Sequence, residues 1–175
     1  MIFLSLLALF TGLACAQHAR QTGPEIAAIR TYFYVGGDYS ENSNRGYIFR
    51  DHMYVEKISP LAPKHDRASP TVLIHGQGQT GTNFLNKSDG EKSWTSHFLD
   101  AGHTIYIVDQ TFRGQSAWAP RIGAQAPSTY PAKVIQQRFT SPERYDLWPQ
   151  AKLHKQWPGT GTMGDLIFNT FYSNV

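Results

Sequence analysis

Two short apolar runs dominate the hydrophobic pattern of the chain. Residues 72–74 (Val-Leu-Ile) follow Pro70 and precede a glycine-rich loop, and residues 105–108 (Ile-Tyr-Ile-Val) form the second run. Short runs of large apolar residues between breakers are typical of strands buried on both faces. Residues 94–101 have apolar positions at helical spacing and end at Gly102, which predicts a helix with a glycine after its last turn. This order predicts a parallel βαβ unit with a right-handed crossover.

A β-hairpin is predicted upstream of this unit. Residues 25–35 are rich in strand-forming side chains, and residues 47–58 partly alternate apolar with polar positions. The segment Gly36-Gly37-Asp38 is expected to break the first strand, and residues 41–45 form the polar tip. Residues 61–70 contain two prolines, Pro63 and Pro70, and are predicted to be a connector.

Downstream of the second run the pattern predicts helices. Residues 132–139 are expected to be helical, with Ser128 or Thr129 as the cap, and residues 164–175 are expected to form another helix. No third buried parallel strand is evident after Val108. The side chains of Trp118, Trp148 and Trp157 are expected to pack in the core rather than line a substrate mouth.

The first 16 residues have the pattern of a secretory signal peptide. An apolar stretch precedes Ala14-Cys15-Ala16, small residues that suit cleavage before Gln17. The alternatives are a buried N-terminal helix or an uncleaved anchor, although the stretch is shorter than the roughly 20 residues of a membrane span. We therefore expect a secreted domain over residues 17–175 with no membrane span, no thiol and no disulfide, since the single cysteine lies in the removed segment.

Composition excludes several other classes of protein. Hydrophobic residues make up 41% and charged residues 17% of the chain, which predicts a globular domain rather than intrinsic disorder. The net charge of +3 is spread along the sequence, so a nucleic-acid partner is not expected. The seven histidines show no His-x-x-x-His spacing, and no metal or other cofactor is expected. Asn86-Lys87-Ser88 is an N-glycosylation sequon, for which occupancy stays open.

The loop that follows the first apolar run carries the candidate chemistry. His75 ends the run, and glycines occupy positions 76, 78 and 81. Glycine-rich backbone can direct N–H groups at an anion or at an oxyanion that develops during acyl transfer. The alternative is that these glycines only shape a tight turn. His75 itself is expected to bind loop backbone rather than to act as a catalytic base.

The paired motifs at residues 71–81 and 104–116 resemble the N-terminal half of the α/β-hydrolase superfamily, most closely its secreted fungal, esterase-like members. The resemblance implies an α/β fold with an antiparallel hairpin followed by a parallel strand–helix–strand unit. It also implies that Gln77, with its neighbour Gly78, supplies backbone N–H groups to an oxyanion hole, without a cofactor. Asp109 and Arg113 would then pair or bind loop backbone and hold the wall of the site.

The catalytic triad of that family has no match in this sequence. No Gly-x-Ser-x-Gly motif occurs, and Ser116 in Gly-Gln-Ser lacks the closing glycine and precedes Pro120. In the family the acid and the histidine follow the serine, which is a further reason against a catalytic Asp109. We therefore expect a partial hydrolase domain over residues 17–175, truncated before the nucleophile and inactive alone.

Other interpretations stay open at this point. The chain could be a secreted, non-catalytic binding protein on a truncated hydrolase scaffold, or the product of a gene model broken at a missed intron. A longer relative would act on a small-molecule ester. An incomplete sheet would expose an apolar strand edge, which predicts self-association.

Overall fold

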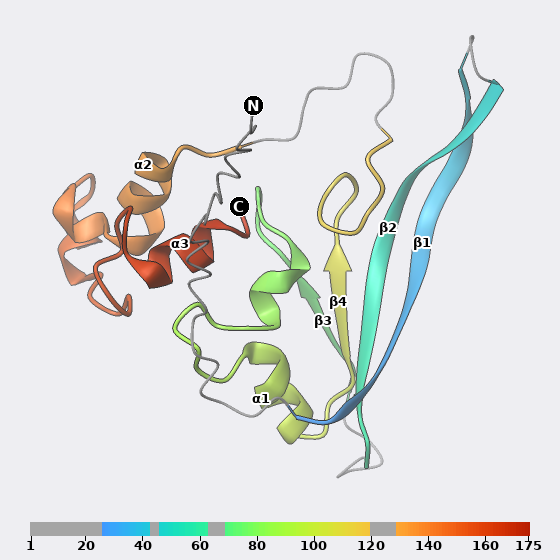
Figure 1. Cartoon of the computed structure of the whole chain (residues 1–175), viewed down its shortest axis with the longest axis horizontal. Coiled ribbons are helices and arrows are strands. Elements are labelled where there is room, and N and C mark those ends of the chain that lie inside the picture. The colour runs from blue at the N-terminus through green and yellow to red at the C-terminus, as the bar shows by residue number, and fades with distance from the viewer. Residues whose placement is uncertain (1–25, 43–45, 63–68, 120–128) are drawn as a thin grey trace, which may run out of the picture.

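The computed structural model describes residues 26–42, 46–62, 69–119 and 129–175, so the expected signal peptide lies outside the described residues. The described strands form one mixed sheet in the order β1-β2-β4-β3. Its strands are β1 (Ala28–Asn42), β2 (Gly46–Pro60), β3 (Thr71–Ile74) and β4 (Ile105–Asp109). The short parallel strands lie beside one end of a much longer hairpin (Figure 1).

The predicted antiparallel hairpin is confirmed, but the predicted break in its first strand is wrong. β1 pairs with β2 from Ala28↔Pro60 to Asn42↔Gly46. Gly36 and Gly37 have φ angles of 71° and 88°, and the strand continues through them. Because glycine adopts positive φ at little cost, the pair forms an irregularity inside the strand rather than an end to it.

The predicted parallel strand pair is also confirmed. Thr71 to Ile74 of β3 pair in register with Ile105 to Val108 of β4. β4 pairs on its other side with β2 in antiparallel fashion. β3 is consequently an edge strand of the described sheet, and the carboxyl ends of β3 and β4 lie next to each other.

Burial of β3 on both faces was predicted, and this prediction is wrong. Val72 is 55% exposed and Ile74 is 60% exposed, whereas Leu73 packs against the core. The reason is that the helix and turn between β3 and β4 cover only one face of the sheet. The core on that face is centred on buried side chains from three elements, namely Ile58, Leu99, Ile105 and Ile107.

Two predicted helices begin and end close to the expected residues. α1 (Trp94–Asp100) starts at Ser93, whose side chain accepts a hydrogen bond from the Ser96 N–H, and Gly102 follows it with φ of 89°. α3 (Leu166–Tyr172) starts at Asp165, which accepts hydrogen bonds from two backbone N–H groups of its first turn. Side-chain capping satisfies N–H groups that a helix start leaves without a partner.

The helix predicted over residues 132–139 is present as α2 (Ala132–Ile135) and the π-helical turn η2 (Gln136–Thr140). Its predicted cap is wrong for Thr129, because Pro131 occupies the N-cap position without a side-chain hydrogen bond. Ser128 lies outside the described residues. The remaining elements are three single 3₁₀ turns, η1 (Gly81–Phe84), η3 (Pro142–Arg144) and η4 (Pro149–Leu153).

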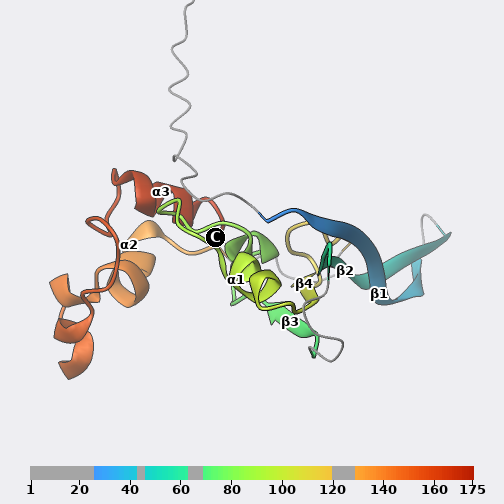
Figure 2. The same ribbon diagram turned by 90° about the horizontal axis from the view of Figure 1, so that it is seen from below.

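The C-terminal helical segment and the long hairpin lie at opposite ends of the molecule. Figure 2 shows α2 and α3 beyond the β3 side of the sheet, with α1 between them and β1. Within the described ranges, no helix has both the length and the apolar character that crossing a membrane would require.

Candidate functional site

Two loops meet where β3 and β4 end. Residues 75–81 follow β3, and residues 110–116 follow β4. Because these parallel strands are neighbours, their carboxyl ends bring both loops to one edge of the sheet, where α/β proteins commonly bind ligands. Gln110 joins them, since its side-chain amide donates a 2.9 Å hydrogen bond to the His75 carbonyl oxygen.

His75 is a buried structural residue of this edge, as expected from the sequence. The side chain is 4% exposed, and its Nε2 accepts a 3.1 Å hydrogen bond from the Gln110 backbone N–H. A backbone N–H can only donate, so the other ring nitrogen carries the proton. Nδ1 accordingly donates to the Gly76 carbonyl oxygen at 2.9 Å. Both ring nitrogens are engaged with loop backbone, which leaves neither for proton transfer in this arrangement.

Asp109 fastens both loops to the end of β4. Its carboxylate is buried, and each oxygen accepts one backbone hydrogen bond of 2.7 Å, from Gly81 on one side and from Gln115 on the other. A carboxylate that accepts two fixed N–H groups holds their backbones at a defined separation. The expected role of Asp109 in binding loop backbone is therefore confirmed.

Arg113 also binds the first loop, in line with the role expected for it. Its Nη1 donates to the Gly78 carbonyl oxygen at 3.4 Å. The contact runs from the loop after β4 to the loop after β3 and so adds a second bridge between them. It holds the carbonyl group of Gly78.

Ser116 lies in the interior, which agrees with the argument against it as a nucleophile. Its side chain is 4% exposed; Oγ donates a 2.6 Å hydrogen bond to the Asp109 carbonyl oxygen and accepts one of 2.8 Å from the Tyr54 N–H. Burial raises the pKa of the Tyr54 phenol, and the neighbouring Glu56 carboxylate raises it further.

The two residues expected to bear oxyanion donors lie at the outer turn of the first loop. Gln77 is exposed, whereas Gly78 is buried and has φ of 81°. Within the described part of the chain, no group accepts a hydrogen bond from the backbone N–H of either residue. The next N–H groups are used, since Gln79 donates to Gly76 and Gly81 donates to Asp109. The N–H groups on either side of the turn are thus held by the chain itself, whereas those of Gln77 and Gly78 have no acceptor among the described residues.

The C-terminal segment covers this loop, a contact that sequence reasoning missed. A Cβ on Gly78 would lie 2.7 Å from two ring carbons of Tyr130 and 3.8 Å from a methyl carbon of Val175. The Tyr172 hydroxyl donates a 2.7 Å hydrogen bond to the Tyr130 carbonyl oxygen and so holds that residue in place. No local signal marks these contacts, because the partners are far apart in the sequence.

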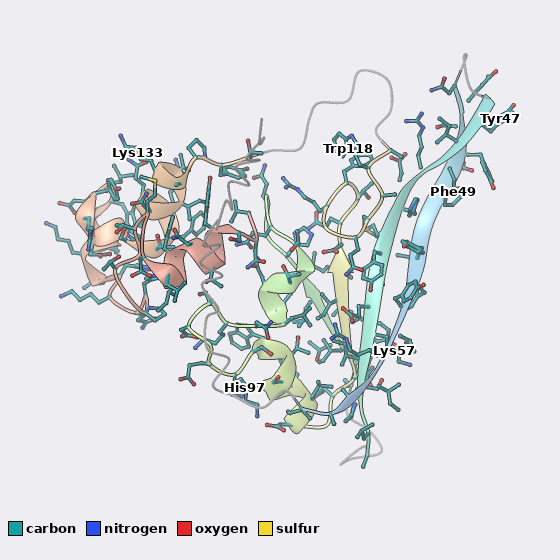
Figure 3. The ribbon with its side chains drawn as sticks, viewed as in Figure 1. Tyr47, Phe49, Lys57, His97, Trp118 and Lys133 are labelled. Carbon is teal, nitrogen blue, oxygen red and sulfur yellow. The ribbon has the colours of Figure 1, made fainter. Side chains whose placement is uncertain are left out.

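Two tryptophans predicted to be in the core are exposed. The rings of Phe112 and Trp118 are 5.3 Å apart in an edge-on arrangement, and Trp118 is 49% exposed beyond the end of β4 (Figure 3). Trp148 is 36% exposed as well. Placing these two tryptophans in the core was therefore wrong, because neither is enclosed by the elements described around it.

No group of three or more metal-ligating side chains occurs within the described ranges. The arrangement instead offers backbone N–H donors on a braced loop. Such donors can stabilise an anion or a developing oxyanion.

Comparison with known proteins gives one extensive sequence similarity, and no family model matches the chain. The chain is 45% identical over 154 residues to a protein described as probable secreted lipase phiG, from Fungal sp. (strain ATCC 74256). The similarity covers 88% of this chain but only 38% of the relative. The chain thus spans well under half the length of the protein that it matches.

A solved structure described as a novel bacterial esterase is similar at 31% identity, with a TM-score of 0.45. That similarity covers 55% of this chain and 32% of the esterase. In sequence, the chain is therefore similar to a protein described as a lipase.

Proposed function

We propose that the chain is part of a secreted serine hydrolase that acts on carboxylic esters, built on an α/β-hydrolase fold. One observation carries the proposal: the loop after β3 presents the backbone N–H groups of Gln77 and Gly78 without a described acceptor, beside the end of β4. The description of the 45%-identical relative as a probable secreted lipase supports the reaction class and the compartment.

The proposed role of the two N–H groups is to stabilise the oxyanion of the acyl-transfer intermediate. Attack on an ester carbonyl places negative charge on its oxygen, and a preorganised donor lowers the barrier by roughly 3 kcal/mol. Preorganisation is supplied by the contacts beneath the loop, because Asp109 fixes the Gly81 N–H and Arg113 fixes the Gly78 carbonyl. No cofactor takes part in this chemistry.

The nucleophile, acid and base of the proposed hydrolase come from outside these 175 residues. Ser116 is buried with both its donor and acceptor capacity used, and no Gly-x-Ser-x-Gly occurs in the sequence. His75 is likewise held by the loops. We therefore expect the chain alone to hydrolyse no p-nitrophenyl ester above the rate of the buffer.

The first experiment is to sequence the transcript beyond the codon for Val175. The proposal expects an in-frame strand followed by Gly-x-Ser-x-Gly, then an acid and a histidine in that order. In the longer product, Gln77→Pro removes one N–H donor and should lower kcat by roughly 10²–10³-fold. Gln77→Ala is the matched control, because it keeps the backbone N–H, and its kcat should stay near the wild-type value.

Two results would reject this function. The first is an equal kcat for Gln77→Pro and Gln77→Ala in the longer product, which would show that the Gln77 N–H does not stabilise the oxyanion. A transcript that ends after residue 175 without further coding sequence would favour the second candidate, a secreted non-catalytic binding protein. The buried Ser116 and the occupied His75 are the observations that favour this candidate, since a binding protein needs neither as a catalyst.

We also propose that the chain associates with itself through β3. The strand is an edge of the described sheet and exposes Val72 and Ile74 on one face. Exposed apolar edge strands pair readily with other strands.

A further inference from the structure

The turn that follows η1 carries the sequon Asn86-Lys87-Ser88, which the ester chemistry does not use. Asn86 and Lys87 are exposed and belong to neither helix nor strand. The chain then turns, with Gly90 donating a 3.0 Å hydrogen bond to the Lys87 carbonyl oxygen. An asparagine on an exposed, non-helical segment is accessible to the enzyme that transfers glycans.

A groove begins directly beside this sequon. It has a volume of about 430 Å³ and is lined by Lys87, Glu91, Lys92, Trp94 and His97. Its volume lies within the range of small-molecule sites, roughly 300–1,000 Å³. Lys87 belongs to both the sequon and the groove wall, so a group attached to Asn86 would start at the groove.

Trp94 contributes an indole ring to the lining of the groove. The indole is 62% exposed although it belongs to the first turn of α1, and the Phe98 ring stacks against it at 6.2 Å with an interplanar angle of 28°. Phe98 thereby holds the indole in position. His97 lies on the outer face of α1, away from the sheet (Figure 3).

The chemistry of this groove matches a sugar. The C–H faces of a pyranose ring are apolar and stack on an indole, whereas its hydroxyl groups need polar partners. Lysine ammonium groups donate hydrogen bonds, and a glutamate carboxylate accepts them. The groove offers both kinds of group around the indole, through Lys87, Lys92 and Glu91.

We propose that Asn86 is an N-glycosylation site and that the first sugars of its glycan stack on Trp94 in this groove. In the transfer step, the Asn86 carboxamide nitrogen bonds to the anomeric carbon of a lipid-pyrophosphate-linked oligosaccharide. The carbon–oxygen bond to the pyrophosphate breaks, the amide loses one proton, and the lipid pyrophosphate leaves. The inference rests on the secretory part of the proposed function, because the sugar donor is encountered in the secretory pathway.

The experiment is expression of the full chain in a yeast secretory host, once with its own residues 1–16 and once with a host leader in their place. Intact mass is measured before and after treatment with peptide N-glycosidase F, which converts a glycosylated asparagine to aspartate. We expect one glycan, at Asn86, with the host leader. Asn86→Gln and Ser88→Ala should abolish it, and Ser88→Thr should keep it.

The two leaders separate failure of the site from failure of secretion. If the host leader delivers the chain into the secretory pathway and Asn86 still carries no glycan, the proposed glycosylation site is rejected. If Asn86 is glycosylated with the host leader but not with residues 1–16, the site is supported. The same result counts against secretion of the chain by its own residues 1–16. Chain retained inside the cell is recovered from the membrane fraction and examined by the same mass measurement.

The stacking on Trp94 is tested by thermal unfolding of glycosylated chain and of the unglycosylated Ser88→Ala and Asn86→Gln variants. Loss of the glycan should lower Tm by about 2–4 °C in the wild-type background. In a Trp94→Ala background it should leave Tm unchanged. Trp148→Ala, which alters another exposed tryptophan, is the control and should preserve the full decrease. An equal decrease in all three backgrounds, or no decrease in any, would show that the glycan does not stack on Trp94.

Discussion

The ring of Tyr130 lies against Gly78 so closely that a Cβ on the glycine would be 2.7 Å from two of its carbons. Gly78 also has φ of 81°, a conformation that L-residues with a Cβ disfavour. The close contact and the backbone conformation therefore both require glycine at this position. The loop that presents the proposed oxyanion donors is thus fixed in part by a residue that lies 52 positions later in the chain, because the C-terminal segment folds back over it.

Substitution of Gly78 by alanine should therefore destabilise the chain more than the same change at a glycine in open space. Gly46 is the matched control, since its φ is 78° and a Cβ there would meet nothing within 4 Å. Gly46→Ala isolates the backbone cost of about 1–2 kcal/mol. Gly78→Ala should cost about 1–3 kcal/mol more, through overpacking against Tyr130. The measurement is the free energy of unfolding in urea.

A second substitution separates the two causes at Gly78. In a Tyr130→Ala background the space above the glycine is opened, so the cost of Gly78→Ala should fall towards that of Gly46→Ala. Equal costs in both Tyr130 backgrounds would mean that the ring contact does not constrain the loop.

Asp109→Asn should loosen both loops at the end of β4. The carboxylate accepts one N–H from Gly81 and one from Gln115, whereas an amide offers a single acceptor and turns its own N–H₂ group towards the other donor. One buried N–H loses its partner, at a cost of about 1–3 kcal/mol. Chemical denaturation measures the loss, and amide exchange at Gly81 and Gln115 locates it.

Asp38→Asn is the control for this change, because the Asp38 carboxylate is exposed on β1 and accepts a hydrogen bond only from the adjacent Tyr39 N–H among the bonds described. Its effect on stability should stay within about 0.5 kcal/mol. If the two substitutions had equal effects, Asp109 would not be holding the loops.

Charges on β3 should reduce the proposed self-association. Ile74 is 60% exposed on the uncovered face of this edge strand, and a lysine there opposes strand pairing by desolvation and repulsion between copies. Ile74→Lys should shift the sedimentation profile towards monomer. Ile29→Lys is the matched comparison, since Ile29 is 53% exposed on β1 at the opposite edge. A monomer shift with Ile29→Lys alone would place the contact at β1 instead.

Acid should weaken the start of α3. The backbone N–H of Thr160 is the main hydrogen-bond donor that holds the pKa of Asp165 below its usual value, and the N–H groups of Phe168 and Ile167 add to the effect against the opposing influence of burial. A depressed folded-state pKa means that the stabilisation is present above the unfolded-state pKa of about 3.9 and is lost as pH falls through the folded value.

The pH dependence of unfolding tests this prediction. Between about pH 5 and pH 2, the wild-type chain should lose more stability than Asp165→Ala, which lacks the titrating group. Helicity monitored by circular dichroism should show the loss. Parallel pH profiles for the two proteins would mean that Asp165 does not stabilise the helix start through its charge.

The sequence pattern was sufficient for the parallel strand pair and for the roles of His75 and Asp109. The apolar runs are contiguous in the sequence. The polar residues at their ends, His75 and Asp109, find their nearest hydrogen-bond partners in the backbone of the loops that follow. The failures concern tertiary surroundings. Exposure of Val72 and Ile74 depends on which face of the sheet is covered, and the Tyr130 contact depends on chain folding over a long separation. The Gly36-Gly37 pair resembles a turn in sequence but is tolerated within a strand.

The hydrogen bond from the Tyr54 N–H to Ser116 Oγ has a consequence for the order in which the chain folds. The two residues are 62 positions apart, so this bond forms only after β2 has paired with β4. Contacts over such separations are slow to form because a long segment must close first. The loop after β4 should consequently gain its amide protection together with the sheet, in one kinetic phase, and not as an early local turn.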